Sequence, residues 1–317
     1  MKRLLLLLAL VPALAFAQYP AKPVKIIVPA QPGGGLDLVG RTIALEMSKT
    51  FGQSFFVENS AGGGGSIAAM ATARADPDGY TLMVGYVGTH GTNPAVRKLN
   101  YDAVKDFTPI SMVGGTPNLL VVTPGVPATD LKSFIDYAKR NPEKLNYGTG
   151  GSGLLNHLAL EQFRAAAGIE QVTYAHYRGI GPAFKDMLGG QIQVLMPGLA
   201  AALPHLRNEK VRPLAVTGLQ RHPLIPDVPT FEELGFKGFD GVQWYGIVGP
   251  AKLPADVTQR LNAEINKAIS SPALQQRLAS EALTVMPMTP AEFGAFMQAD
   301  IARYSALARA RNIKLDD

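Results

Sequence analysis

Glycine-rich loops are the part of this sequence best suited to binding chemistry, because each follows a strand-like run and opens a helical segment. Residues 33–35 follow the apolar run 24–28, and residues 148–153 precede the helical segment 154–167. Unpaired backbone N–H groups and the positive end of the helix dipole meet at such a point, which suits a carboxylate or a phosphate. A third loop, residues 62–65, has the same form. Any one loop can be a plain turn, but two matching loops in similar units favour a shared anion site.

Polar residues lie in or beside these loops and after two further strand-like runs. The glycines and polar residues that we expect to contact a ligand are Gly33, Gly34, Gly35, Thr89, His90, Ser152, Gly153, His157, Arg178 and Gly179. Arg178 can pair with a carboxylate through two N–H groups, or it can fix its own loop through a salt bridge. His157 can contact the ligand, or it can be a half-buried histidine bonded to the loop backbone. Asp37 is expected to cap or brace the first helix, because a bare carboxylate repels an anion.

Signatures of enzymes and of metal sites are missing. The chain has no cysteine, which excludes thiolate metal sites and thiol nucleophiles, and its five histidines are never three to five residues apart. Ser66 and Ser152 follow glycines but lack the second glycine of a nucleophile elbow. Residues 148–153 match a dinucleotide-binding fingerprint, but the strand before them is short and polar. We therefore predict no catalytic residue, metal or cofactor; a secreted α/β hydrolase whose catalytic groups meet only in space stays the alternative.

The elements that must position these loops alternate between strands and helices. Apolar runs at residues 24–28, 55–57 and 80–84 are separated by amphipathic segments, a pattern typical of parallel sheets with helices on both faces. A strand, a glycine loop and a helix recur together at residues 144–167, which predicts two similar α/β lobes. The candidate crossings between them are Val121-Val122 and Trp244-Tyr245-Gly246. The predicted lobes are residues 18–121 with 243–317, and residues 122–242.

The N-terminus has the form of a secretory leader. Lys2 and Arg3 precede an apolar run at residues 4–14, and Ala15-Phe16-Ala17 matches a cleavage site. We expect residues 1–17 to be a signal peptide and the mature chain to be a soluble periplasmic protein; an N-terminal membrane anchor is the alternative. The formal net charge is +5, with 30 basic and 25 acidic residues scattered along the chain. Such a small, dispersed excess argues against nucleic acid and suits an anionic ligand.

These segments, as a set, resemble the substrate-binding proteins of tripartite tricarboxylate transporters, the Bug family. The opening motif is Val-Pro-Ala-Gln-Pro-Gly-Gly-Gly-Leu-Asp at residues 28–37, with Arg41. The similarity runs from about Tyr19 to the C-terminus in the order typical of the family. The further matching segments are residues 57–59, 62–63, 76–82, 147–148, 153, 157–158, 177–179, 186–190, 212, 214–216, 226–230 and 244–246.

The resemblance implies an α/β, two-lobed periplasmic binding protein fold, similar to type II, in which each lobe is a mainly parallel sheet flanked by helices. It also implies a ligand cleft between the lobes, a small dicarboxylate or aromatic carboxylate as ligand, and delivery to integral membrane transporter subunits. We expect a monomer that is not an enzyme. A ligand sensor for a membrane receptor would bind in the same way and stays open as an alternative.

Two segments depart from the family pattern. Residues 194–197 read Val-Leu-Met-Pro where many members carry an acidic residue, which argues against an amino-acid ligand. We expect Met196 and Pro197 to form an apolar wall for an aliphatic or aromatic body. Residues 174–177 read Tyr-Ala-His-Tyr in place of His-Val-Pro-Tyr, which alters the loop that carries Arg178.

Overall fold

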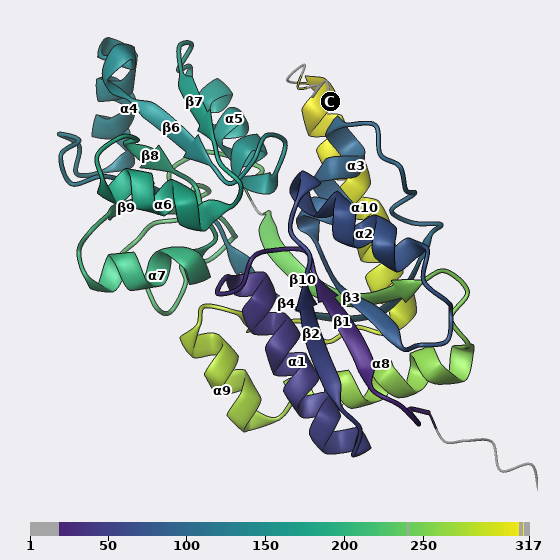
Figure 1. Cartoon of the computed structure of the whole chain (residues 1–317). Coiled ribbons are helices and arrows are strands. Elements are labelled where there is room, and N and C mark those ends of the chain that lie inside the picture. Colours follow the sequence, from purple (N-terminus) through teal and green to yellow (C-terminus); the bar gives the residue numbers. More distant parts are fainter. Residues whose placement is uncertain (1–18, 240, 311–312, 314–317) are drawn as a thin grey trace, which may run out of the picture.

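The chain folds into two α/β lobes that lie side by side (Figure 1). The structure is a computed structural model that describes residues 19–239, 241–310 and 313. The predicted signal peptide, residues 1–17, lies outside the described residues. Each lobe has a mixed sheet flanked by helices, so the predicted two-lobed α/β fold is confirmed.

Lobe 1 is built on a sheet whose described strands run in the order β11-β4-β10-β3-β1-β2. Their bounds are β1 Val24–Val28, β2 Phe55–Asn59, β3 Thr81–Tyr86, β4 Phe107–Pro117, β10 Val242–Pro250 and β11 Thr284–Val285. β1 is parallel to β2 and β3, whereas β10 is antiparallel to both of its neighbours. Ile26, Ile27 and Val28 are at most 2% exposed, and because successive side chains point to opposite faces, this strand is covered on both faces.

Lobe 2 is built on a sheet in the order β7-β6-β8-β5-β9. The bounds are β5 Leu119–Val122, β6 Asn146–Thr149, β7 Thr173–His176, β8 Val194–Leu195 and β9 Arg212–Val216. β6 is parallel to β7 and β8, and β5 is antiparallel to β8 and β9. Leu120 and Val122 pack into one apolar core while Leu119 and Val121 pack into another, because successive side chains of a strand point to opposite faces.

Both sheets have the same topology, which explains the repeated unit in the sequence. The strands of lobe 1 lie in the order β2-β1-β3-β10-β4, with β11 added beside β4, and those of lobe 2 lie in the order β7-β6-β8-β5-β9. Position by position, the two orders correspond, and in each of them the fourth strand is an inserted antiparallel one. The inserted strand is β10 in lobe 1 and β5 in lobe 2, and each of them starts where the chain enters that lobe. The first crossing is at Asn118, between β4 and β5, and not at Val121-Val122, which pair inside β5. Trp244 to Gly246 likewise lie inside β10, so the return crossing comes before them.

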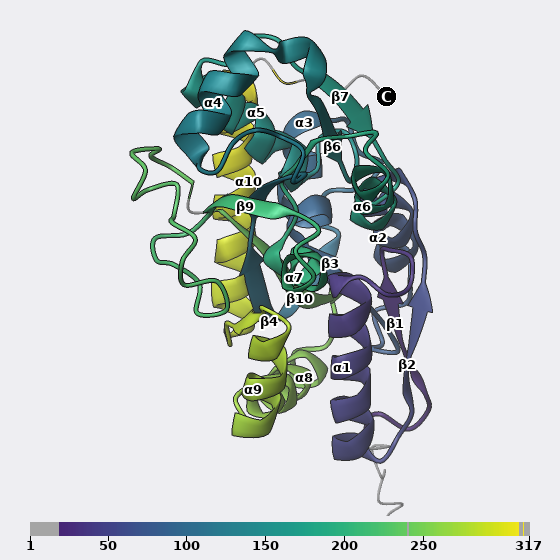
Figure 2. The same ribbon diagram turned by 90° about the vertical axis from the view of Figure 1, so that its left-hand side faces the viewer.

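The helices cover the faces of both sheets. Their bounds are α1 Gly35–Phe51, α2 Ser66–Ala73, α3 Asn93–Val96, α4 Leu131–Arg140, α5 Leu155–Ala167, α6 Ile180–Leu188, α7 Leu199–Arg207, α8 Ala255–Ile269, α9 Pro272–Ser280 and α10 Pro290–Ala310. α1 lies unusually close to its sheet because Gly40 has no side chain: a Cβ there would be 2.5 Å from Val28 Cγ2. α10 runs along lobe 1 and reaches α5 of lobe 2 at its C-terminal end (Figure 2).

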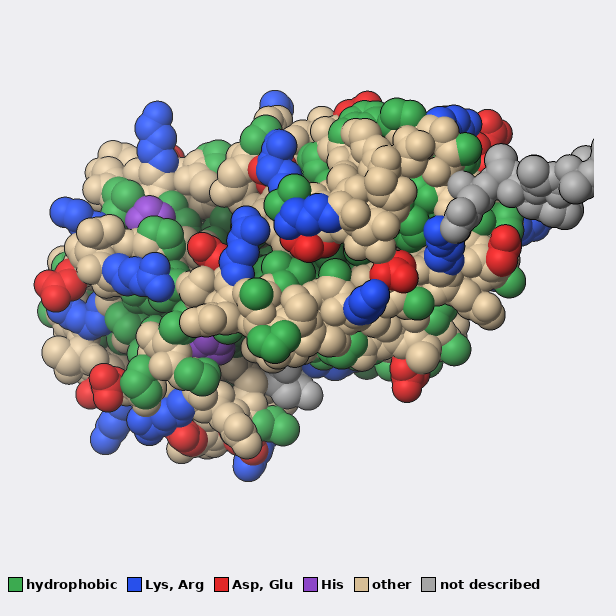
Figure 3. Space-filling view, turned by 90° about the horizontal axis from the view of Figure 1, so that it is seen from below, with side chains coloured by type: hydrophobic (Ala, Val, Ile, Leu, Met, Phe, Trp, Pro, Cys, Tyr) green, Lys and Arg blue, Asp and Glu red, His purple; other side chains and the backbone are tan. Residues whose placement is uncertain are grey.

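Neither membrane-spanning helices nor metal clusters are found in the described residues. No helix in them is long and apolar enough to cross a bilayer. They also contain no group of three or more His, Cys, Asp or Glu side chains arranged to hold a metal ion. On the face shown in Figure 3, Lys and Arg side chains are interspersed with acidic and hydrophobic ones and form no continuous basic surface.

Candidate functional site

The carboxyl ends of the parallel strands in both lobes carry loops that meet where the lobes touch. We call residues 29–34 and 60–65 of lobe 1, with residues 150–154 and 177–179 of lobe 2, the interlobe loops. Arg97 Nη2 of lobe 1 donates a hydrogen bond of 2.5 Å to the Ser152 carbonyl of lobe 2. A Cβ on Gly64 would lie 3.5 Å from Leu154 Cδ2, across the same boundary. These contacts show that the lobes touch here, with the interlobe loops gathered at the interface.

Asp37 holds the first loop in shape. Its carboxylate accepts hydrogen bonds from Gly33 N–H at 3.0 Å, Arg41 Nε at 2.9 Å and Asn59 Nδ2 at 2.9 Å. Burial alone would raise the pKa of this carboxyl, but the bonds from Arg41, Asn59 and Gly33 outweigh burial and hold the pKa below its ordinary value. Asp37 is therefore a charged brace beneath the loop, as its position in the sequence predicted.

The first turn of α1 leaves backbone donors available. Its N-cap, Gly34, has extended backbone angles and no side-chain cap. In the described part of the chain, the N–H groups of Gly34 and Gly35 have no acceptor. The upper end of α1 lies against lobe 2, beside α7 and below α6, in both Figure 1 and Figure 2. These N–H groups and the helix dipole therefore present a positive end to the interface between the lobes.

Gly34 and Gly181 are glycines that neither the backbone nor the packing requires. Gly34 has φ −98°, which any residue adopts, and Gly181 lies in the first turn of α6. A Cβ added at either position would meet nothing within 4 Å. Both residues are exposed. The missing side chains therefore leave room for a ligand to reach the backbone at the starts of two helices, one in each lobe. Gly181 was not among the residues predicted from the sequence.

The second glycine loop is held by His157. Gly153 has φ +75°, a conformation that favours glycine, and its N–H donates to His157 Nδ1 at 3.0 Å. Burial, reinforced by neighbouring His176, lowers the pKa of His157 to about 4, so the ring is neutral at neutral pH. Because Nδ1 accepts, the ring proton lies on Nε2. The structure therefore shows the backbone-bonded histidine of the two alternatives, and the Gly153 N–H is already used.

Arg178 is the positively charged side chain of lobe 2 that is a candidate for pairing with an anionic ligand. It lies with Gly179 in the loop between β7 and α6, and its side chain is exposed. No carboxylate within the described ranges pairs with it, so the alternative of a structural salt bridge is not found there. Gly179 has φ +122° and caps α6 without a side chain. The charge of Arg178 thus adds to the positive end of the α6 dipole.

Thr89 and His90 lie inside lobe 1, where their side chains have no exposed surface. Thr89 Oγ1 is 2.8 Å from His90 Nδ1, and the His90 ring packs edge to face against Phe107 with centroids 4.6 Å apart. Burial lowers the pKa of His90 to about 3. Both side chains shape the turn after β3 and present no atom at the surface.

The apolar wall for a ligand that was expected at residues 196–197 is not formed by Met196. Met196 has no exposed surface and packs into the core of lobe 2, while the Pro197 carbonyl accepts from Leu119 N–H at 2.8 Å. Met196 therefore fills the lobe interior.

Several polar residues at the interface gave no signal in the sequence. Tyr86 Oη and Asn93 Nδ2 both donate to the Gly64 carbonyl, at 2.9 and 2.8 Å. Asn93 Oδ1 and Arg97 Nε are buried without a partner in the described structure. These residues surround the point where Arg97 crosses to lobe 2. Their spacing along the chain follows no motif, so only the folded arrangement brings them together.

Comparison with known proteins places this geometry in a family. The sequence profile described as "Tripartite tricarboxylate transporter family receptor" (TctC) matches residues 39–313. The adipate-bound protein Rpa4515 of R. palustris is 32% identical with a TM-score of 0.90, covering 93% of this chain and 99% of that one. MatC (Rpa3494) of Rhodopseudomonas palustris, with bound malate, is 33% identical with a TM-score of 0.85, over 91% and 99% of the two chains.

The same relationship extends to the protein described as the periplasmic binding protein BugD. It is 29% identical with a TM-score of 0.87, covering 93% of this chain and 99% of that one. The resemblance stated from sequence motifs is thereby confirmed, since the profile spans most of the described lobes and the structural neighbours share both of them. This chain belongs to the TctC family of periplasmic solute-binding proteins, the tripartite tricarboxylate transporter family receptors.

Proposed function

We propose that this protein binds a small carboxylate between its lobes in the periplasm and delivers it to the membrane subunits of a tripartite transporter. The observation that carries the proposal is the open space at Gly34 and Gly181, where two helices of opposite lobes begin without side-chain caps. The neighbours with adipate and malate support a carboxylate. Membership of the family supports both the location of the protein in the periplasm and its delivery of ligand to transporter subunits. We expect a monomer that releases its ligand unchanged.

The carboxylate would be held mainly by backbone N–H groups. The first turn of α1 and the first turn of α6 each supply donors and a positive dipole end, and Arg178 supplies a full charge beside α6. Hydrogen bonds to a charged group are about twice as strong as neutral ones. Of the predicted contacts, Gly34, Gly35, Ser152, Arg178 and Gly179 fit this direct role. Gly33, Gly153 and His157 fit a role in holding the loops.

Closure would follow from contacts to both lobes. A ligand that touches α1 and α6 together binds the closed form better than the open form, so it shifts the equilibrium toward closure. The bond from Arg97 to the Ser152 carbonyl is a lobe-to-lobe contact that the closed form gains. A transporter can then distinguish the loaded protein from the empty one by its shape.

A thermal-shift screen tests this function. The mature protein is titrated with aliphatic and aromatic mono-, di- and tricarboxylates, with amino acids as the comparison class. At a hundred times its dissociation constant, a true ligand adds about 2.7 kcal/mol to the free energy of unfolding. Selective stabilisation by one carboxylate class, with the compound recovered intact, supports capture and release. No stabilisation by any carboxylate, or conversion of the compound, contradicts the proposal.

A further inference from the structure

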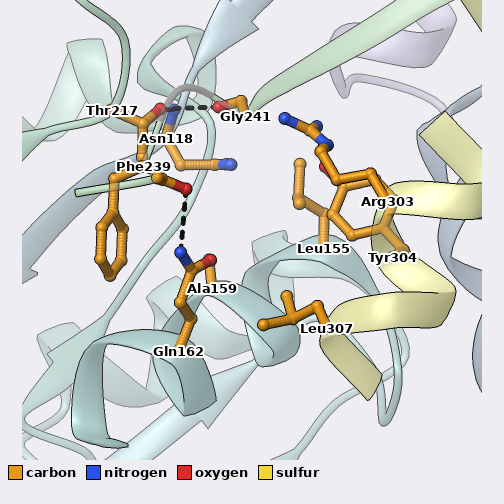
Figure 4. Close-up of a pocket in the computed structure, with 11 residues that line it drawn as sticks. Asn118, Leu155, Ala159, Gln162, Thr217, Phe239, Gly241, Arg303, Tyr304 and Leu307 are labelled. Atoms are coloured by element: carbon orange, nitrogen blue, oxygen red, sulfur yellow. Dashed lines mark hydrogen bonds between the residues drawn. The ribbon is translucent and has the colours of Figure 1, made fainter. Parts of the chain in front are cut away.

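A cavity lies beside the segments in which the chain crosses between the lobes. It has a volume of about 250 Å³. Six of the residues that line it define what we call the hinge pocket: Asn118, Leu155, Ala159, Thr217, Tyr304 and Leu307. They come from the segments that cross between the lobes (Asn118 and Thr217), from α5 of lobe 2 and from α10 of lobe 1 (Figure 4).

Asn118 gives the hinge pocket an unusual polar feature. The residue has no exposed surface, and neither Oδ1 nor Nδ2 has a partner in the described part of the chain. The side chain extends into the pocket (Figure 4). Its backbone is fixed, because its N–H donates to Thr217 Oγ1 at 2.8 Å. Since buried polar groups are nearly always hydrogen-bonded, a primary amide with both ends unpaired implies a partner inside the pocket.

The other polar groups of the pocket already have partners. Thr217 Oγ1 donates to the Gly241 carbonyl at 2.8 Å, and Gln162 Nε2 donates to the Gly238 carbonyl at 2.9 Å. Arg303 Nη2 bonds to Asp300 Oδ1 at 2.8 Å, so its charge is compensated by an adjacent carboxylate. The remaining wall consists largely of aliphatic and aromatic carbon. The pocket is thus apolar with one amide that both donates and accepts.

We propose that the hinge pocket is a second binding site, which takes a small uncharged molecule with an apolar body and a primary amide end. A primary amide matches Asn118 because it supplies one donor and one acceptor side by side. A charged end is disfavoured, because no uncompensated charge lines the pocket among the residues that the structure describes. Cavities of about 150 Å³ admit benzene, so this larger one has room for a benzene ring with one polar substituent.

Occupancy of the pocket is coupled to hinge bending, because its walls belong to both lobes. Leu155 and Ala159 belong to α5 of lobe 2, whereas Tyr304 and Leu307 belong to α10 of lobe 1. A molecule that fits the closed arrangement therefore favours closure and raises the affinity of the interlobe ligand, and the effect is reciprocal. This second step rests on the proposed function, whereas binding in the pocket does not.

Benzamide is the probe for the site, with toluene and benzoate as comparisons. Isothermal titration and ligand-observed NMR of the mature wild-type protein should show saturable benzamide binding at least tenfold tighter than toluene or benzoate. The Asn118→Leu variant keeps the branched shape and the number of side-chain heavy atoms and removes the amide, so it should bind toluene more tightly than benzamide. The Ala159→Met variant fills the pocket from α5 and should bind none of the three.

Three outcomes would overturn the site. One is non-saturable benzamide binding to the wild type, another is equal benzamide affinity in wild type and Asn118→Leu, and the third is unchanged binding in Ala159→Met. If Asn118→Leu does not fold, Ala159→Met decides alone. Coupling is measured separately, as the affinity of the screened carboxylate with and without saturating benzamide. An unchanged carboxylate affinity would refute the coupling and leave the site and the proposed function standing.

Discussion

Replacing Gly34 by valine separates ligand approach from protein stability. Gly34 has φ −98° and ψ 177°, angles that a β-branched residue adopts without strain. A Cβ there meets nothing within 4 Å, so the protein itself accommodates the side chain. Valine is a poorer N-cap than glycine by about 1 kcal/mol, and the stiffer unfolded chain offsets about 0.4–1 kcal/mol. We therefore expect the free energy of unfolding to change by less than about 1 kcal/mol.

The effect on binding should be much larger, because the valine methyl groups occupy the space through which a carboxylate reaches the N–H groups of α1. Losing one hydrogen bond to a charged group costs about 1.5–3 kcal/mol. Since each 1.4 kcal/mol is a tenfold change, the dissociation constant should rise about 10- to 150-fold. Isothermal titration with the carboxylate found in the screen measures the affinity, and thermal unfolding without ligand measures the stability.

Gly125→Val is the matched control. Gly125 is exposed, its φ is not positive, and a Cβ there also meets nothing within 4 Å. It follows β5, which runs opposite to its neighbours β8 and β9, so it lies at the edge of the sheet away from the interlobe loops. This variant should bind like the wild type. The reasoning fails if a folded Gly34→Val protein keeps wild-type affinity, or if Gly125→Val loses as much.

Further predictions concern stability, closure and pH. Gly181→Ala should raise the free energy of unfolding by about 0.5–1 kcal/mol, because alanine favours the helix, yet it should weaken carboxylate binding. A rise in both the free energy of unfolding and the carboxylate affinity would contradict a ligand at α6. Arg97→Met should expand the ligand-free protein in small-angle scattering and weaken binding, whereas Arg140→Met, which loses only the bond to the Asp136 carbonyl inside α4, should do neither. The pKa of His90 is about 3 when folded and about 6.5 when unfolded, so its neutral form stabilises the protein above pH 6.5 and this stability is lost as the pH falls. Below pH 6 the loss approaches about 1.4 kcal/mol per pH unit, and His90→Asn should reduce that slope in urea unfolding measured from pH 7 to 5.

The fold was predictable because its signals are local and repeated. Buried strands such as β1 are short β-branched runs, and helix starts such as Thr289 with Glu292 form a reciprocal capping box, which the structure shows. The crossings between lobes were placed less well. Asn118 follows the run Gly-Gly-Thr-Pro at residues 114–117, which is typical of a turn, yet the structure keeps that run inside β4. The composition of residues 107–122 therefore does not reveal where the chain leaves one sheet and enters the other.

The site was predictable where it depends on glycine and hardly at all where it depends on contacts across the lobes. Gly34 could be predicted from its position between a strand and a helix. Arg97 could not, since its partner is the carbonyl of Ser152, 55 residues away, and a backbone carbonyl has no sequence signature. Thr89 and His90 follow a strand as expected, but whether a side chain after a strand points outward depends on the turn, which here buries both.

Recognition by helix N-termini, as proposed here, does not by itself determine the length of the ligand. Helix N-termini such as those of α1 and α6 read the charge and oxygens of a carboxylate but make no contact with the rest of the molecule. Ligand length must then be set by the separation of the two helix starts, which depends on how far the lobes close. Neighbours of this fold carry ligands as different in length as malate and adipate. A change at the hinge, for example beside Asn118, should therefore alter which carboxylate fits without altering any residue that binds it. The thermal-shift screen tests this argument. In Asn118→Leu, the ranking of carboxylates by stabilisation should differ from that of the wild type according to ligand chain length and not according to ligand charge.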